Sequence, residues 1–242
     1  MRKPSTVVIV ILVCLAALGL GTVSVAQVQG LIFADGFESG DTSAWFRTRE
    51  QTPGALDVNT AAAMAGSTYG LEVAADGIAW VETREPDRER DLKVSFFFNP
   101  DNIELIPGAR IDILRFYGKG RHHHLRLVLR GAGPGLSRLA LLVRGNSGRY
   151  QEIGSGLVVA GAENLIEVDW RAASTRNDTN GSAALWINGE LEANEPSIAN
   201  GRLDVRSIRL GSVALVSHQN PEFVPDVAGY FDEVTILRPE AP

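Results

Sequence analysis

The chain has 242 residues, of which 45% are hydrophobic and 21% charged, and its formal net charge is −6. It has no run of lysines or arginines that would make an electrostatic footprint for phosphate, so a nucleic-acid partner is not expected. A single cysteine, Cys14, excludes a disulfide framework, and the length is sufficient for one sizeable hydrophobic core.

The first 26 residues predict a signal peptide. Arg2 and Lys3 precede an apolar run over residues 7–25, and Ser24 and Ala26 are small residues at the two positions that a signal peptidase reads, so cleavage is expected before Gln27. This predicts a secreted protein, extracellular or periplasmic, with no membrane partner after cleavage. A retained anchor is the alternative, because about 20 apolar residues also span a bilayer.

Residues 27–242 are predicted to form one all-β domain. The periodic segments alternate apolar and polar residues with period two, and almost none has the spacing of an amphipathic helix. The expected strands, in chain order, are 70–73, 79–83, 92–98, 111–117, 122–130, 137–144, 165–171, 183–187, 207–210 and 230–237. Turn sequences such as Asn188-Gly189 lie between them. Many short strands at close spacing predict antiparallel sheets in a sandwich or barrel.

The hairpin within residues 111–130 can be placed in register by its apolar side chains. Leu114 and Leu125 face the core together if a loop over 118–121 pairs Tyr117 with His122. Sugars are held by aromatic rings and a few fixed polar groups. The candidate carbohydrate-binding residues are therefore Trp80 and the polar face of this hairpin, namely Arg115, Tyr117, His122, His124 and Arg126. The alternative is that Trp80 belongs to the core and the polar row is wet surface.

Several stretches of the mature chain resemble a known family. These are FADGFESGDTSAW (33–45), AENLIEVDWRAAS (162–174), ALWINGE (184–190), RSIRLGSV (206–213) and YFDEVTIL (230–237). They are similar to the concanavalin A-like, laminin G-like jelly-roll domains of secreted bacterial proteins. The resemblance implies an antiparallel two-sheet jelly-roll sandwich whose first and last strands lie side by side, with a calcium ion near that seam. Galactose-binding-like carbohydrate modules are the alternative fold.

Acidic residues near both ends of the domain independently indicate an ion. Strand alternation places Asp232 on an apolar face, where a carboxylate is costly unless it meets a cation or several donors. Calcium binds carboxylate and carbonyl oxygens. The predicted ligands of a structural Ca²⁺ are Asp35, Glu38 and Asp232, with Asp41 as a further candidate. The alternative is that backbone amides hold Asp232, while Asp35 and Asp41 cap turns.

Two stretches invite comparison with glycoside hydrolases, which need paired carboxylates. Residues 85–89 read Glu-Pro-Asp-Arg-Glu, but proline and arginine stand where a working strand needs apolar residues, so a solvated loop is expected. Residues 166–171 have apolar intervals, yet Arg171 replaces the third carboxylate. No catalytic residue is therefore assigned.

His122 and His124 leave two other chemistries open. They could share a zinc ion with Asp112 or His218. Alternatively, with Arg115 and Tyr117, they could form a lyase site in which a base removes a proton beside a uronic acid carboxylate.

Together these features predict a secreted, non-catalytic β-sandwich module that binds extracellular carbohydrate and has a structural calcium site. A polysaccharide-active enzyme, either a lyase or a glycoside hydrolase, and a purely structural surface module are the alternatives.

Overall fold

The computed structural model describes residues 30–74, 77–84, 88–101, 105, 109–133, 136–216 and 227–239. Over these residues the chain forms fifteen β-strands and one 3-10 turn, η1 (Lys119–Arg121), with no α-helix. Every strand pair is antiparallel. The predicted fold class, an all-β antiparallel jelly-roll sandwich, is confirmed.

The strands have the following bounds. They are β1 (Leu31–Asp35), β2 (Arg47–Glu50), β3 (Leu56–Asn59), β4 (Gly70–Ala74), β5 (Ala79–Glu82), β6 (Asp91–Asn99), β7 (Arg110–Tyr117), β8 (His123–Gly133), β9 (Leu136–Arg144), β10 (Tyr150–Val159), β11 (Asn164–Arg171), β12 (Gly181–Ile187), β13 (Glu190–Ile198), β14 (Ser207–Val216) and β15 (Val227–Leu237).

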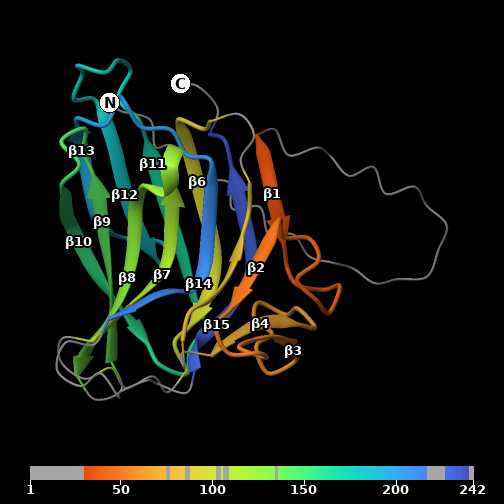
Figure 1. The fold of residues 1–242 in the computed structure, drawn as a ribbon. Coiled ribbons are helices and arrows are strands. Elements are labelled where there is room, and N and C mark those ends of the chain that lie inside the picture. Colours follow the sequence, from red (N-terminus) through yellow and green to blue (C-terminus); the bar gives the residue numbers. More distant parts are fainter. Residues whose placement is uncertain are drawn as a thin grey trace, which may run out of the picture.

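The strands form two layers that continue into each other at one edge. The first layer has the order β2-β5-β14-β7-β8-β9-β10, and the second has the order β13-β12-β11-β6-β15-β4-β3. The layers join where β10 pairs with β13 at Gly154 and Ala193. Figure 1 shows β7, β8 and β14 lying over β6, β11 and β12.

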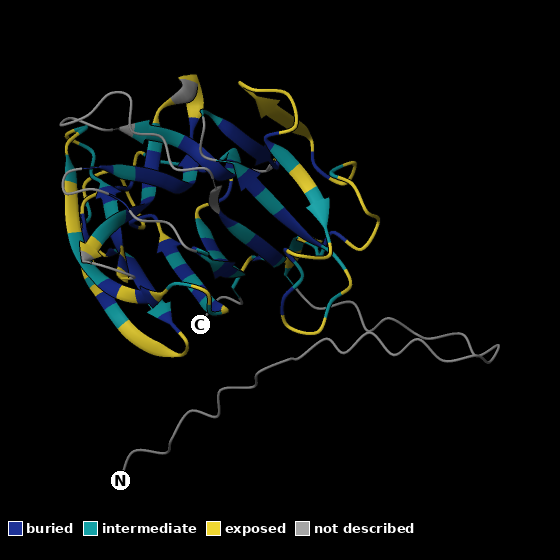
Figure 2. Ribbon diagram, turned by 90° about the horizontal axis from the view of Figure 1, so that it is seen from below, coloured by how far each residue is buried: buried dark blue, intermediate teal, exposed yellow. Residues whose placement is uncertain are grey.

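The hydrophobic core lies between these layers. In β6 the alternation is complete: Leu92, Val94, Phe96 and Phe98 are all fully buried, while the residues between them are partly exposed. Trp170 of β11 is the largest fully buried side chain. Figure 2 shows the resulting bands of buried and exposed residues along the strands. Each buried large apolar side chain contributes about 1.5–3 kcal/mol of transfer free energy, so this interior stabilises the sandwich without disulfides.

The first and last strands of the domain are neighbours. β1 pairs with β15, with Asp35 opposite Val234, and the amide of Arg238 donates to the carbonyl of Gly30 at 2.6 Å. This adjacency is the one that the family resemblance implies.

The sequence pattern misses several strands that the fold contains. β2 is exposed at every position and β10 contains Gly154 and Gly156, so neither shows a period of two. β13 is mostly polar and contains Pro196. These strands form because neighbouring strands supply hydrogen bonds and packing, which a local pattern does not record.

The predicted signal peptide, residues 1–26, lies outside the described residues, as do His218 and residues 85–87. In the part of the chain that is described, no helix is long and apolar enough to cross a membrane.

Candidate functional site

The β7–β8 hairpin has a different register from the predicted one. Phe116 lies opposite Leu125 and Leu114 opposite Leu127, a shift of two residues from the expected pairing of Leu114 with Leu125. Tyr117 lies opposite His123, so His124 is the extra residue of a β-bulge. The bulge places His124 on the same side as the buried Leu125, where it stacks on Trp170, so His123 takes the outer-face position.

On the outer face of this hairpin, two guanidinium groups share one buried carboxylate. Asp112 is 0% exposed, and the Nε atoms of Arg115 and Arg126 each lie 2.6 Å from its Oδ2. Arg126 also donates to Oδ1 at 2.9 Å. Burial lowers the pKa of Arg115, but Asp112 and Tyr117 outweigh that effect and the net shift is upward. Two guanidinium charges against one carboxylate leave this cluster positive.

His123 lies between two tyrosine rings beside this cluster. Its ring centroid is 5.9 Å from that of Tyr117 and 5.2 Å from that of Tyr150. Burial, and then the charges of Arg115 and Arg126, lower the pKa of His123 to about 4, so its imidazole is neutral at pH 7. Burial raises the pKa of Tyr150 to about 12, and its hydroxyl donates to the backbone carbonyl of His123.

Trp80 lies at the other end of the same face, under an arginine. The Cζ atom of Arg209 is 3.9 Å from the Trp80 ring centroid and 4.3 Å from that of Tyr117. Arg209 is fixed by Glu82, whose Oε2 lies 3.2 Å from Arg209 Nε. Because Trp80 is only 3% exposed, its indole stabilises Arg209 by a cation–π contact and does not present a free face to a sugar.

These contacts define the outer-face row. It consists of Trp80, Asp112, Arg115, Tyr117, His123, Arg126, Tyr150 and Arg209. Four of the six predicted binding residues lie in it, namely Trp80, Arg115, Tyr117 and Arg126. The sequence did not assign His123, Tyr150 or Arg209 to this face, because the bulge has no local signal and Tyr150 begins a strand that the pattern misses.

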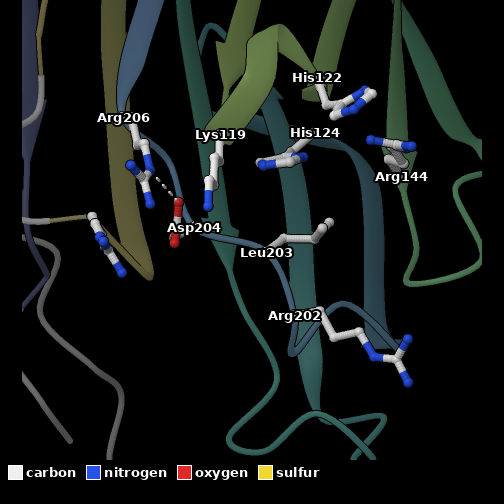
Figure 3. A pocket seen from close by; sticks show the side chains of 9 residues that line it. Lys119, His122, His124, Arg144, Arg202, Leu203, Asp204 and Arg206 are labelled. Atoms are coloured by element: carbon white, nitrogen blue, oxygen red, sulfur yellow. Dashed lines mark hydrogen bonds and ion pairs between the residues drawn. The ribbon is translucent and has the colours of Figure 1, made fainter.

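His122 and His124 instead line a cavity of about 310 Å³ at the end of the hairpin (Figure 3). Asp112, predicted as a third zinc ligand for His122 and His124, is bound by Arg115 and Arg126 on the outer face and does not reach these histidines. No three His, Cys, Asp or Glu side chains among the described residues are arranged to hold a metal ion.

The carboxylates predicted to bind calcium all accept hydrogen bonds. Asp232 is fully buried and accepts from Met64 N at 2.7 Å, Ser67 Oγ at 2.5 Å and Glu233 N at 2.7 Å. Burial raises its pKa to about 6 despite these donors. The contacts match the alternative in which protein donors hold Asp232, and the calcium site stays a prediction.

Asp35 and Glu38 lie nearby with donors of their own. Asp35 accepts from Phe37 N at 2.9 Å and from Trp45 Nε1 at 2.7 Å. Glu38 accepts from the amides of Thr68 and Tyr69 at 2.8 and 2.9 Å. Asp41 caps a turn by accepting from Ser43 N at 2.9 Å.

Glu233 adds a carboxylate that the sequence did not single out. Burial, followed by the charges of Glu38 and Asp35, raises its pKa. Like charges therefore crowd this end of the β1–β15 seam.

The strand compared with glycoside hydrolases lies in the second layer. Glu167, Asp169 and Arg171 of β11 share the face away from the core, and Arg171 holds the place of a third carboxylate. Burial raises the pKa of Asp169 to about 6, against the opposing charge of Lys93. In the other candidate stretch, Glu89 is buried and bound by Arg238.

Solved structures with a similar fold include alginate lyases and a saccharide-binding domain. Alginate lyase Aly36B matches with a TM-score of 0.54 and 12% identity over 89% of this chain and 96% of its own. The alginate lyase from Alteromonas sp.272 matches with a TM-score of 0.51 and 12% identity, over 84% and 98%. Domain 4 of AbnA, an extracellular GH43 arabinanase from Geobacillus stearothermophilus, matches with a TM-score of 0.54 and 14% identity, over 86% and 92%.

This chain shares its fold with those proteins. At such low identities the likeness concerns the fold alone. No protein-family model matches the sequence, and no curated protein matches it.

Proposed function

We propose that this protein binds an acidic polysaccharide across the outer-face row. The observation that carries the proposal is the positive Asp112–Arg115–Arg126 cluster beside the rings of His123 and Tyr150. Guanidinium groups bind carboxylates and sulfates with fixed geometry, and flat rings pack against sugar rings. Asp112 fixes both guanidinium groups in place before a ligand arrives, which lowers the entropic cost of binding.

The fold supports a saccharide ligand. Structures of the same fold include an Aly36B variant in complex with alginate tetrasaccharide and the AbnA domain in complex with arabinotriose. The predicted signal peptide supports a site of action outside the cytoplasm, where such polysaccharides occur.

Isothermal titration calorimetry of the protein tests this proposal, with polyuronate oligosaccharides compared with neutral gluco-oligosaccharides of equal length. We expect the acidic ligand to bind more tightly, with an affinity that falls as salt is added. Arg126→Gln should weaken it about tenfold by removing a charge-assisted hydrogen bond. The control is Arg138→Gln, an exposed arginine of β9 that contacts Ser155. Equal affinity for acidic and neutral ligands, or an unaffected Arg126→Gln variant, would contradict the proposal.

The neutral imidazole of His123 favours a second candidate, a polysaccharide lyase. With a uronate carboxylate held by Arg115, an unprotonated His123 can remove the adjacent ring proton. The electron pair left behind forms a carbon–carbon double bond as the glycosidic C–O bond breaks, and the leaving oxygen takes a proton from a phenol such as Tyr117. The ultraviolet absorbance of the unsaturated product reports this reaction. A protein that binds polyuronate without forming that product is a binding module, and one that does neither is a structural module.

We also propose a structural calcium ion at the β1–β15 seam. Support comes from the like charges of Asp35, Glu38 and Glu233, whose mutual repulsion a divalent cation would relieve once these side chains turn toward it from their present arrangement.

A further inference from the structure

A second concave surface lies next to the outer-face row, at the end of the β7–β8 hairpin. Its cavity of about 310 Å³ is lined mainly by charged side chains and histidines, among them Lys119, His122, His124, Arg144, Asp204 and Arg206. In Figure 3, Lys119 comes from the hairpin turn, while Asp204 and Arg206 come from the segment that leads into β14. Arg144 is the last residue of β9. The lining is therefore brought together by the fold from distant parts of the chain.

The cavity has the opposite charge to the protein as a whole. Its lining contains five cationic side chains and one carboxylate, whereas the whole chain has a net charge of −6. The carboxylate of Asp204 is paired with Arg206 at 2.9 Å. Arg144 donates from Nε to the carbonyl of Gly148 at 3.1 Å, which fixes its guanidinium group at the rim. A concave surface with this charge attracts an anion.

His124 gives the cavity a second, independent feature. It is only 4% exposed, and its Nδ1 has no hydrogen-bond partner among the residues that the structure describes. The backbone carbonyl of Asp204 lies on the Nε2 side of the ring, which favours the tautomer with its proton on Nε2 and an acceptor at Nδ1. Burial, and then the charge of Arg144, lower the pKa of His124 to about 4, which keeps the ring neutral at pH 7. A buried acceptor without a partner is costly, and a ligand that donates to it relieves that cost.

The two features together restrict the chemistry of the ligand. A ligand that matches the cationic side chains has an oxyanion. A ligand that also matches His124 Nδ1 has a hydrogen-bond donor close to that oxyanion. A uronic acid ring has a carboxylate and hydroxyl groups on one small frame, whereas a sulfate ion has no donor at neutral pH. A cavity of about 310 Å³ is at the small end of ligand sites and suits a single sugar ring.

We propose that this cavity binds one uronic acid residue, with its carboxylate among Lys119, Arg144 and Arg206 and a ring hydroxyl donating to His124 Nδ1. The proposal rests on the proposed function and extends it, because it adds a subsite at the end of the β7–β8 hairpin that holds a single acidic unit. The outer-face row holds the rest of the glycan chain.

The experiment is an NMR titration of the full chain with glucuronate, glucose and inorganic sulfate as separate probes, following the ring signals of His124. We expect glucuronate to bind more tightly than sulfate and glucose not to bind. Arg144→Gln should weaken glucuronate at least tenfold. His124→Phe, which keeps a ring against Trp170, should weaken glucuronate about tenfold and leave sulfate unchanged. Arg138→Gln is the matched control, since it removes the same charge from an exposed position of β9.

The results separate this proposal from the one on which it rests. The cavity proposal is wrong if glucuronate does not bind, or if Arg144→Gln and His124→Phe bind glucuronate as tightly as the wild-type protein does. Either result holds whether or not polyuronate binds the outer-face row. If glucuronate binds as expected but polyuronate affinity does not respond to Arg126→Gln, the cavity stands and the outer-face row fails. Equal shifts of His124 with glucuronate and sulfate would indicate a simple anion site and would overturn the assignment to a sugar.

Discussion

Gly118 lies directly against the imidazole of His124. A Cβ atom on residue 118 would come within 1.9 Å of His124 Nε2 and 2.7 Å of the Asp204 carbonyl. The φ and ψ of Gly118, −105° and −158°, are accessible to alanine, so the requirement for glycine is steric.

This contact predicts that Gly118→Ala displaces His124 from Asp204. We expect a loss of about 1–3 kcal/mol of folding free energy, as for other overpacked buried sites, measured by urea unfolding. The double variant Gly118→Ala/His124→Ala should recover part of that loss, because the clash disappears with the ring. If the two substitutions are additive, the clash is not the cause.

The buried Asp112 should be among the most sensitive charged positions of the chain. Asp112→Ala leaves Arg115 and Arg126 close together without their shared carboxylate, so we expect a loss of about 3–5 kcal/mol by chemical denaturation. Glu152→Gln is the comparison, because its ion pair with Arg130 at 2.9 Å is partly exposed. That change should cost less than about 1 kcal/mol. Similar losses of folding free energy for both variants would show that burial does not make the Asp112 ion pairs more important for stability.

Asp169 predicts a pH-dependent stability. Burial raises its pKa from 3.8 to about 6, so between these pH values the folded state binds more protons than the unfolded state. Stability contributed by this group therefore falls as the pH rises from about 4 to 6 and stays low above that. Asp169→Asn should raise the unfolding midpoint by a few degrees at pH 7 and have no such effect below pH 4. If the difference in unfolding midpoint between Asp169→Asn and the wild type does not change with pH, titration of Asp169 is not its cause.

The calcium prediction is tested by thermal unfolding in excess calcium and in chelator. If an ion joins β1 and β15, calcium raises the midpoint by several degrees, and Glu38→Gln, a change at an exposed carboxylate, reduces that rise. Asp178→Asn, a change at a partly exposed carboxylate that caps a distant turn, is the control. If the midpoint is the same in both solutions, protein donors alone satisfy Asp232.

The alternation within single strands carries most of the fold prediction. β6 and β11 follow it at every core position, and Asn188 and Gly189, with φ of 54° and 81°, form the two-residue turn expected between β12 and β13. The candidate site is less accessible to such reasoning. The bulge at His124 changes which side chains share a face, although the alternation on both sides of it is regular. The contact of Asp232 with Met64 and Ser67 joins segments far apart in sequence, which no local pattern reports.

The bulge in β8 also connects the outer-face row to the cavity through two adjacent residues. One backbone irregularity places His123 in the outer-face row and His124 in the cavity, so a shift of the peptide that joins them would move both rings. Deleting residue 124 would return the strand to a uniform alternation, keep His123 opposite Tyr117 in the outer-face row and remove the imidazole from the cavity. A glycan that reaches across the hairpin tip would therefore contact two adjacent residues of one strand, one in the outer-face row and one in the cavity.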